Sequence, residues 1–232
     1  MSGAVVLHSG GMDSSLCLAL AIREHGKENV ISLGFRYGQR HEPELLRAKR
    51  ICAKWSVSQQ IADLTALKDL IPDNALTHSD QLIVRESKEP ASTMVVGRNG
   101  LMAQVAGIYA HQLGYDSIYM GVLGLEGANS GYRDCSREYI DLKEAALRLD
   151  LANPRFHIET PLVHMTKKET MHLGYELGVL EYLLQETITC YQGIPEAGCG
   201  VCPACELRNE GIQEFMQEVP DFRLPYSLSS QK

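Results

Sequence analysis

The chain has 232 residues, of which 44% are hydrophobic and 22% are charged, as is ordinary for a globular protein. No apolar run approaches the roughly 20 residues that cross a bilayer, so we expect no membrane segment. No basic region precedes a long apolar stretch near the N-terminus, so we expect no secretory signal. The sequence therefore predicts a cytoplasmic protein. Lys and Arg total 22 against 29 Asp and Glu, a net charge of −7 that favours small-molecule substrates, because nucleic-acid binders usually carry a basic excess.

The first predicted elements surround a glycine turn. Residues 4–8 form an apolar run typical of a buried parallel strand, and we expect the following helix to be capped by Asp13 or Ser14 and to end at His25-Gly26. Between them stands Ser9-Gly10-Gly11-Met12-Asp13-Ser14. A strand, a glycine turn and a helix N-terminus in succession present backbone N–H groups to an anion, so this segment predicts a phosphate site.

The residue types in this turn suit a pyrophosphate group. Gly10 and Gly11 allow the backbone to approach the ligand, and the helix end adds roughly half a positive charge. Ser9 and Ser14 supply hydroxyl donors, and Asp13 either holds Mg²⁺ or caps the helix. The turn matches neither the dinucleotide-binding glycine fingerprint nor the nucleotide loop that ends in Gly-Lys-Ser/Thr.

The rest of the chain alternates predicted strands and helices. Strands are expected at residues 30–35, 59–64, 117–122 and 156–160, and helices at 43–55, 101–113 and 136–149. This alternation indicates an α/β fold with a doubly wound, mostly parallel sheet, whose ligands bind outside the carboxyl ends of the strands where the strand order reverses. We therefore expect the loops at residues 8–14, 36–41 and 121–135 to converge on one pocket. Residues 67–94 have weak periodicity and are expected to form a mobile flap.

Four cysteines near the C-terminus have the spacing of a metal site. Cys190, Cys199, Cys202 and Cys205 follow the pattern C-x8-C-x2-C-x2-C, and the glycines and the proline among them favour tight turns. Four thiolates complete a tetrahedral Zn²⁺ shell, so we expect a structural zinc site that holds the C-terminal segment against the pocket. An iron–sulfur cluster is the main alternative, and disulfides are the weaker one.

The other cysteines and the histidines stand in different contexts. Cys17 and Cys52 fall within apolar helical stripes, where a small buried side chain is the expected role. Cys135 lies in a strand-end loop, where we favour a buried thiol over a functional group. The histidines show no metal-ligand spacing, and His41, which shares its loop with Arg40, is the one worth testing.

The Ser9–Ser14 turn resembles the SGGxDS loop of the ATP pyrophosphatase (PP-loop) superfamily, whose members cleave ATP between its α- and β-phosphates and leave AMP on a substrate oxygen. Over residues 4–215 the chain also resembles the 7-cyano-7-deazaguanine synthase family, in segments 37–41, 97–99, 131–135, 159–162 and 186–191 and in the four cysteines. The resemblance implies an adenine nucleotide alpha hydrolase-like fold. It also implies an enzyme that uses ATP, Mg²⁺ and ammonia to convert 7-carboxy-7-deazaguanine, through adenylated acid and amide intermediates, to the nitrile, on the route to queuosine.

The same resemblance implies a set of site residues. The implied catalytic residues are Asp13, Arg98 and Asp134; the ATP-binding residues are Ser9, Gly10, Gly11, Met12, Asp13, Ser14, Arg36 and Gly97; the substrate-binding residues are Tyr37, Gln39, Arg40, His41, Arg98, Asn99, Tyr132, Asp134 and Cys135. The planar fork of Arg98 suits a phosphate or a carboxylate, and Asp134 suits a guanine-type N–H edge. Asn99 either contacts a polar edge of the substrate or caps the helix that starts beside it.

Departures from the family pattern fall in three places near the expected substrate pocket: at Val96, in residues 132–136 and in the segment before Gly131. Val96 and Arg133 stand where the family has proline, and Ser136 follows Cys135 where the family has arginine. The segment before Gly131 is longer than in the family, with Glu126 in place of an aspartate. These departures leave open an enzyme that stops at the amide or uses a related acid.

Two further alternatives concern the class of protein. The first is a tRNA-modifying enzyme, which requires a nucleophilic cysteine outside the metal cluster, with Cys135 as the candidate. The second is a nucleotide-binding module without turnover. In either case we divide the chain into a PP-loop domain (residues 1–185), a zinc-binding segment (186–218) and a flexible tail (219–232). We expect a homodimer that acts on small molecules, without membrane or nucleic-acid partners.

Overall fold

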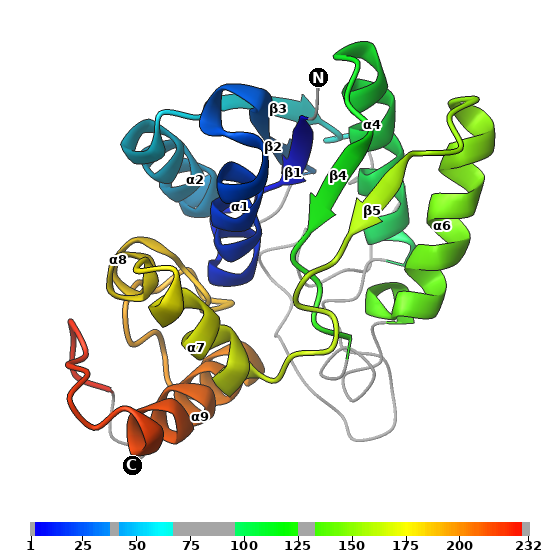
Figure 1. Ribbon diagram of the computed structural model, residues 1–232. Helices are drawn as coiled ribbons and strands as arrows, with labels where there is room; N and C mark the ends of the chain where they lie inside the picture. Colours follow the sequence, from blue (N-terminus) through cyan, green and yellow to red (C-terminus); the bar gives the residue numbers. More distant parts are fainter. Residues whose placement is uncertain (1–2, 38–41, 67–95, 125–132, 229–232) are drawn as a thin grey trace.

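The described strands form one parallel sheet. A computed structural model describes residues 3–37, 42–66, 96–124 and 133–228. Within these residues β1 (Ala4–Leu7), β2 (Val30–Arg36), β3 (Ser58–Asp63), β4 (Ser117–Met120) and β5 (His157–Glu159) pair in the order β3-β2-β1-β4-β5, and every pairing is parallel (Figure 1). The predicted α/β fold is confirmed, with strand ends within about two residues of those expected from the apolar runs.

Helices cover both faces of this sheet. They are α1 (Met12–His25), α2 (Glu42–Trp55), α4 (Arg98–Gln112), α6 (Arg137–Asp150), α7 (Lys167–Glu176), α8 (Leu180–Glu186) and α9 (Pro203–Glu218), with the 3₁₀ turns η1 (Lys27–Asn29) and η2 (Arg133–Cys135). Successive strand residues point to opposite faces, so Val6 of β1 packs with α1 while Val5 packs with α4 and α6. The sheet is therefore doubly wound, as predicted.

The strand order reverses at β1 and β4, and this point carries the Ser9–Ser14 turn. The chain enters α1 directly after β1, and the carboxyl end of β4 packs against the start of that helix. A Cβ on Gly121, which follows β4, would lie 2.7 Å from the backbone nitrogen of Ser14, so only glycine fits this contact. The turn thus lies where doubly wound sheets bind their ligands.

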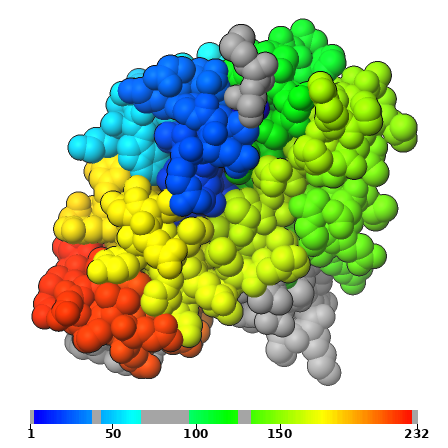
Figure 2. All heavy atoms as spheres, viewed as in Figure 1, coloured from blue at the N-terminus to red at the C-terminus, as the bar shows by residue number. Residues whose placement is uncertain are grey.

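The helices α7, α8 and α9 pack together on the α1 side of the sheet. Figure 2 shows α7 between the N-terminal α1 and the C-terminal α9 on the surface of the molecule. A capping box starts α7, in which the side chains of Thr166 and Glu169 each accept a backbone hydrogen bond from the other residue. Beyond α9, Phe222, Leu224 and Leu228 pack against the same core, and the division of the chain into three parts stays a prediction.

The starts of two helices differ from the expectation. Gly11 is the N-cap of α1, without a side-chain cap bond, so the prediction that Asp13 or Ser14 caps this helix is wrong. Gly97, in the left-handed conformation, is the N-cap of α4, so Asn99 does not cap it. Both helices are capped by a glycine, which has no side chain to cap the helix; Gly97 also needs its freedom to adopt a positive φ, whereas Gly11 has ordinary extended angles.

Several expected features lie outside the described residues, namely Gln39, Arg40, His41, Glu126, Tyr132 and the flap at residues 67–94. Within the described part of the chain, no helix has the length and apolar character needed to cross a bilayer.

Candidate active site

The turn after β1 is fixed from below by a buried polar network. His8, 1% exposed, contacts the hydroxyls of Ser32 at 2.9 Å and Ser15 at 3.0 Å. The Ser15 hydroxyl donates its proton to the Gly11 carbonyl, so the Ser15 oxygen must accept a hydrogen bond from His8 Nε2–H. His8 Nδ1 then carries no proton and accepts from the Ser32 hydroxyl. Burial lowers the pKa of His8 to about 3, so the ring stays neutral and serves as a structural support.

Gly10 is the tightest point of the turn. Its φ of +91° is a conformation that side chains disfavour, and a Cβ there would collide with the backbone of Glu44 and Ala48 in α2. Above the turn, the Ile188 carbonyl oxygen lies 3.7 Å from a Cβ built on Gly11, so the segment leading to Cys190 reaches the Ser9–Ser14 turn. The first helical N–H groups, from Met12 to Ser14, have no partner within α1, as helix geometry requires.

The hydroxyls of the turn hold it in shape. Ser9 N donates to Ser14 Oγ at 3.2 Å, and the Ser14 hydroxyl donates to the Gly11 carbonyl at 3.0 Å. Ser9 Oγ accepts from the Gly11 N–H at 3.2 Å. These bonds keep the backbone of the turn in a fixed, concave form.

Asp13 forms an ion pair that the sequence patterns did not predict. Lys167 Nζ donates to its two carboxylate oxygens at 2.7 and 2.8 Å, from the first residue of α7. The Lys167 side chain is only 5% exposed and that of Asp13 is 26% exposed. The T-x-x-E capping box at Thr166 predicts a helix start, but nothing in the sequence indicates that this lysine reaches a residue 154 positions earlier.

A second group of predicted residues meets at the start of α4. Arg98 donates to the Tyr37 hydroxyl at 3.4 Å and lies 5.8 Å from the centre of its ring. The Asn99 backbone N–H donates to Asp134 Oδ2 at 3.1 Å, and its side chain donates to Cys135 Sγ at 3.3 Å. Tyr37, which follows β2, is thus connected with residues of α4 and η2 that are distant in sequence, and the roles expected for these residues stay predictions.

Cys135 has the character of a buried loop thiol. Burial and the neighbouring Asp134 raise its pKa to about 11, although Arg98 and the bond from Asn99 act in the opposite direction. A thiol with such a pKa is protonated at neutral pH and is a poor nucleophile. The cysteine that the tRNA-modifying alternative requires is therefore disfavoured.

Three residues complete the site. Arg36, at the carboxyl end of β2, lies 3.8 Å from Asp63 of β3, and both side chains are well exposed. Gly97 precedes Arg98, and a Cβ there would meet no atom of the described residues within 4 Å. Glu44, whose role was not predicted, lies in the first turn of α2. Burial raises the pKa of Glu44 to about 7, although the Arg98 guanidinium lowers it.

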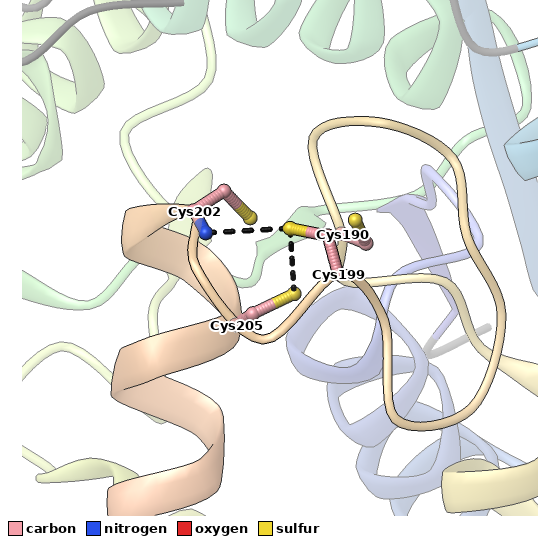
Figure 3. A group of neighbouring side chains, drawn as sticks. All are labelled: Cys190, Cys199, Cys202 and Cys205. Atoms are coloured by element: carbon pink, nitrogen blue, oxygen red, sulfur yellow. Dashed lines mark hydrogen bonds between the residues drawn. The ribbon is translucent and has the colours of Figure 1, made fainter. Parts of the chain in front are cut away.

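The four predicted ligand cysteines come together in one cluster. Cys202 and Cys205 lie at the start of α9, and Cys190 and Cys199 lie on the preceding loop (Figure 3). Their sulfur atoms all lie within 4.8 Å of one another, and Cys199 Sγ lies 3.9 Å from Cys205 Sγ. Backbone N–H groups of Gln192 and Cys202 donate to the sulfurs of Cys190 and Cys199, each at 3.3 Å, as is typical around bound thiolates. The cluster could hold one metal ion.

A buried arginine supports the loop of this cluster. Arg208, 3% exposed, donates to the carbonyl oxygens of Glu196 and Ala197. A Cβ on Gly198 would collide with Cys205 Sγ, and its φ is +68°. The glycine therefore permits the close approach of loop and helix on which the cluster depends.

Comparisons with known proteins agree with this architecture. Residues 3–216 match the family model of the queuosine biosynthesis protein QueC. The 7-cyano-7-deazaguanine synthase of Bacillus subtilis (strain 168) is 42% identical over 213 residues, which cover 92% of this chain and 94% of the relative. The synthase of Clostridium botulinum (strain Loch Maree / Type A3) is 41% identical over 218 residues, covering 93% and 96%.

A solved structure with low sequence identity shares the fold of this chain, and only the fold is inferred from it. The U34-tRNA thiolase NcsA from Methanococcus maripaludis, solved with its [4Fe-4S] cluster, superposes with a TM-score of 0.50 at 15% identity, covering 100% of this chain and 78% of the thiolase. At this identity neither its substrate nor its cluster carries over. The family model and the two synthases instead cover nearly the whole chain, and the chain therefore belongs to the QueC family.

Proposed function

We propose that this chain is an ATP-dependent C–N ligase that converts 7-carboxy-7-deazaguanine and ammonia to 7-cyano-7-deazaguanine, the compound after which its relatives are named. The observation that carries the proposal is the Ser9–Ser14 turn at the reversal of the strand order, in a chain 41–42% identical to two such synthases. An amide-forming enzyme, a tRNA-modifying enzyme and an inactive module are not favoured by this assignment.

The phosphate loop has the features that ATP activation needs. The backbone N–H groups of Met12 to Ser14 and the dipole of α1 would bind the departing pyrophosphate. Lys167, held beside the loop by Asp13, supplies a buried positive charge for the phosphates. Asp13 is the residue that would hold Mg²⁺, which when bound neutralises charge on the pyrophosphate. Arg36 and Gly97 would border the nucleotide.

The group at the start of α4 would bind the deazaguanine acid. Arg98 suits the carboxylate and orients it towards the phosphate loop. Tyr37 and Tyr132 would stack on the ring, and Asp134 would accept from its N–H edge. Asn99 and Cys135 shape this pocket through their contact at 3.3 Å. Gln39, Arg40 and His41 lie outside the described residues and stay predicted substrate contacts.

The reaction needs two activations at one loop. A carboxylate oxygen attacks the α-phosphorus of ATP and pyrophosphate leaves; ammonia then attacks the acyl carbon and AMP leaves with the oxygen. The resulting amide oxygen attacks a second ATP, and AMP leaves again as the nitrile forms. Because both activations join an oxygen of the same carbon to AMP, a single site can serve both.

The product assay is the direct test of this function. Protein, ATP, Mg²⁺, ammonium and 7-carboxy-7-deazaguanine are mixed, and products are identified by mass spectrometry. We expect the nitrile, AMP and pyrophosphate, with the amide as a transient species. Unmodified acid accompanied by ADP would refute the proposal, and accumulation of the amide as the final product would restrict it to the first half of the reaction.

We further propose that the cysteine cluster binds Zn²⁺ as a structural ion. With Zn–S bonds of about 2.3 Å, tetrahedral geometry places sulfurs about 3.8 Å apart, close to the 3.9 Å between Cys199 and Cys205. A cluster of several irons needs a wider arrangement of thiolates than this. Elemental analysis should find zinc in the wild type and in Cys135→Ser but not in Cys205→Ser, whereas iron with acid-labile sulfide would contradict the assignment.

We also propose a cytoplasmic homodimer. All cysteines of the described residues are free thiols, which suits a reducing compartment. Large apolar side chains are exposed on the outer surface of α4 and α6, among them Ile108 at 48%, Leu142 at 68% and Leu149 at 83%. Light scattering should give about twice the 25.7 kDa of one chain. A mass of one chain would contradict the dimer.

A further inference from the structure

Lys167 lies between the Ser9–Ser14 turn and the helix α9. Its ammonium donates to both carboxylate oxygens of Asp13 at 2.7 and 2.8 Å, and its side chain is only 5% exposed. On its other side, the stem of the lysine lies against Gly211 of α9, which packs along α7 (Figure 1). One side chain therefore connects α9 with the turn that is proposed to bind ATP.

Gly211 leaves the space that the stem of Lys167 occupies. A Cβ on Gly211 would lie 2.8 Å from the Cβ of Lys167, 2.9 Å from its Cγ and 3.0 Å from its carbonyl carbon. These atoms belong to the backbone and to the near end of the side chain, so they cannot move aside unless the start of α7 shifts. Gly211 is buried inside α9, where an alanine would favour the helix more. The contact with Lys167, and not the helix, therefore requires a glycine here.

The helix α9 is held in place on both sides of this contact. In its first turns, Cys205 belongs to the cysteine cluster, and the buried Arg208 donates to carbonyl oxygens of the cluster loop. In its last turn, Glu218 accepts a hydrogen bond from Lys168 of α7 at 2.8 Å. The helix thus presents a fixed surface to the buried lysine beside it.

A fixed position matters for a lysine that acts on phosphates. Lysine has a long flexible stem, and ordering this stem each time ATP binds would cost conformational entropy. The surface of α9 and the carboxylate of Asp13 restrict Lys167 before any nucleotide arrives. A charge that is fixed in advance stabilises developing negative charge better than one that must first reorganise.

We propose that Gly211 is a positioning residue for ATP activation, because it seats Lys167 so that the ammonium stays beside Asp13 and the phosphates. This inference rests on the function proposed above. Gly211 touches no reacting atom and acts only through Lys167. The helix that carries two of the cluster cysteines thereby also contributes to the active site.

A double-mutant cycle of Gly211→Ala and Lys167→Met tests whether the glycine acts through the lysine. Exchange of labelled pyrophosphate into ATP, in the presence of 7-carboxy-7-deazaguanine, reports adenylation. Methionine keeps a stem that the new methyl group meets, so the change in packing is similar in both backgrounds. We expect Gly211→Ala to slow exchange about 10-fold or more when Lys167 is present, and less than about twofold when methionine replaces it. Equal losses in the two backgrounds would overturn the role.

Gly174→Ala, in α7, is the matched control for a glycine inside a helix. The atoms nearest to a Cβ there belong to the side chains of Leu16 and Leu180, at 3.2 Å or more, and these side chains can adjust. Exchange in Gly174→Ala should stay within about threefold of wild type. A loss as large as that in Gly211→Ala would contradict a specific role of Gly211.

Acetylation of the Lys167 amine measures its position without any nucleotide. Each protein is treated briefly with an acetylating reagent, and the modification of Lys167 is quantified by mass spectrometry after digestion. Burial and the ion pair with Asp13 should protect the amine in wild type and in Gly174→Ala. In Gly211→Ala we expect acetylation about fivefold faster or more, because the displaced stem exposes the amine. An unchanged rate is incompatible with the positioning role.

Three further outcomes keep the test decisive. If Gly211→Ala fails to fold, as judged by circular dichroism, the double variant Gly211→Ala/Lys167→Gly lacks the stem and should fold; its failure as well would overturn the contact. If wild type shows no exchange, the proposed function fails, while acetylation still decides whether Gly211 positions Lys167. If wild type and Gly211→Ala exchange equally well, only the role of Gly211 fails.

Discussion

The phosphate loop and the start of α4 are built in different ways. The loop depends on backbone fit: Gly10 against α2, Gly121 against α1, and the buried His8 beneath. The start of α4 depends on hydrogen bonds to side chains at 3.1 to 3.4 Å, which Arg98 donates to Tyr37 and Asn99 donates to Asp134 and Cys135. Backbone fit suits the phosphate chemistry shared by a superfamily, whereas side-chain contacts can change with the substrate. The departures from the family pattern at Val96, Arg133 and Ser136 all adjoin the second region.

The largest effect should follow from Gly10→Ala. The new Cβ collides with the α2 backbone at a φ of +91°, so we expect the loop to move and AMP formation to fall about 100-fold or more. Gly114→Ala is the matched control, because its φ is +72° and its Cβ meets nothing within 4 Å. The control should lose about 1 kcal/mol from strain alone and keep its activity. Equal activities of the two variants would contradict the importance of backbone fit.

A smaller effect is expected from Lys167→Met. Loss of this buried cation leaves Asp13 without its partner and removes a positive charge from the phosphates, so we expect about 10- to 100-fold slower pyrophosphate exchange. Its neighbour Lys168 pairs with Glu218 at the surface, and Lys168→Met is the control. Exchange rates that fall equally in both variants would show that the buried pair has no special role.

Asp134→Asn should affect only the second region. The amide oxygen can still accept from the Asn99 N–H, so the start of α4 survives while the charge facing the substrate is lost. Loss of a charged hydrogen bond predicts about a 10- to 100-fold higher KM for the deazaguanine acid, with the KM for ATP within about twofold. Steady-state kinetics with each substrate varied in turn will measure the two KM values. An equal rise in both would contradict the division into two regions.

The smallest effect concerns stability in acid. Because the pKa of His8 is lowered to about 3 in the folded protein, its neutral ring favours folding above about pH 6.5, and that contribution is lost as pH falls towards 3. As pH falls through this range, the free energy of unfolding measured with urea should therefore decrease more steeply for wild type than for His8→Asn, by up to about 1.4 kcal/mol per pH unit. If the stabilities of the two proteins change equally with pH, the buried His8 does not make the stability of the fold pH-dependent.

Sequence patterns were sufficient for the sheet, the phosphate loop and the cysteine cluster. Apolar runs and glycine turns are local features, and the four cysteines lie close together in sequence, so spacing alone predicted their contact. The cap of α1 was misplaced because the backbone angles of Gly11 set the helix start, whereas Ser14 donates to the Gly11 carbonyl.

Residues whose importance depends on tertiary contacts were missed. Lys167 is an ordinary helix residue in the sequence, and only the packing of α7 near α1 brings it to Asp13. Glu44 resembles any acidic residue at a helix start, and only the folded structure buries its side chain and raises its pKa. Neither the burial of a charged side chain nor a partner more than a hundred residues away can be predicted from local periodicity.

The most direct measurement follows the oxygen atoms. With 7-carboxy-7-deazaguanine labelled with ¹⁸O in both carboxylate positions, each activation at the Ser9–Ser14 loop should transfer one labelled oxygen to AMP. We predict that the label ends in the phosphate of AMP, one atom in each molecule, and that the nitrile carries none. Label found in pyrophosphate, in inorganic phosphate or in water, with unlabelled AMP, would contradict adenylation at this loop.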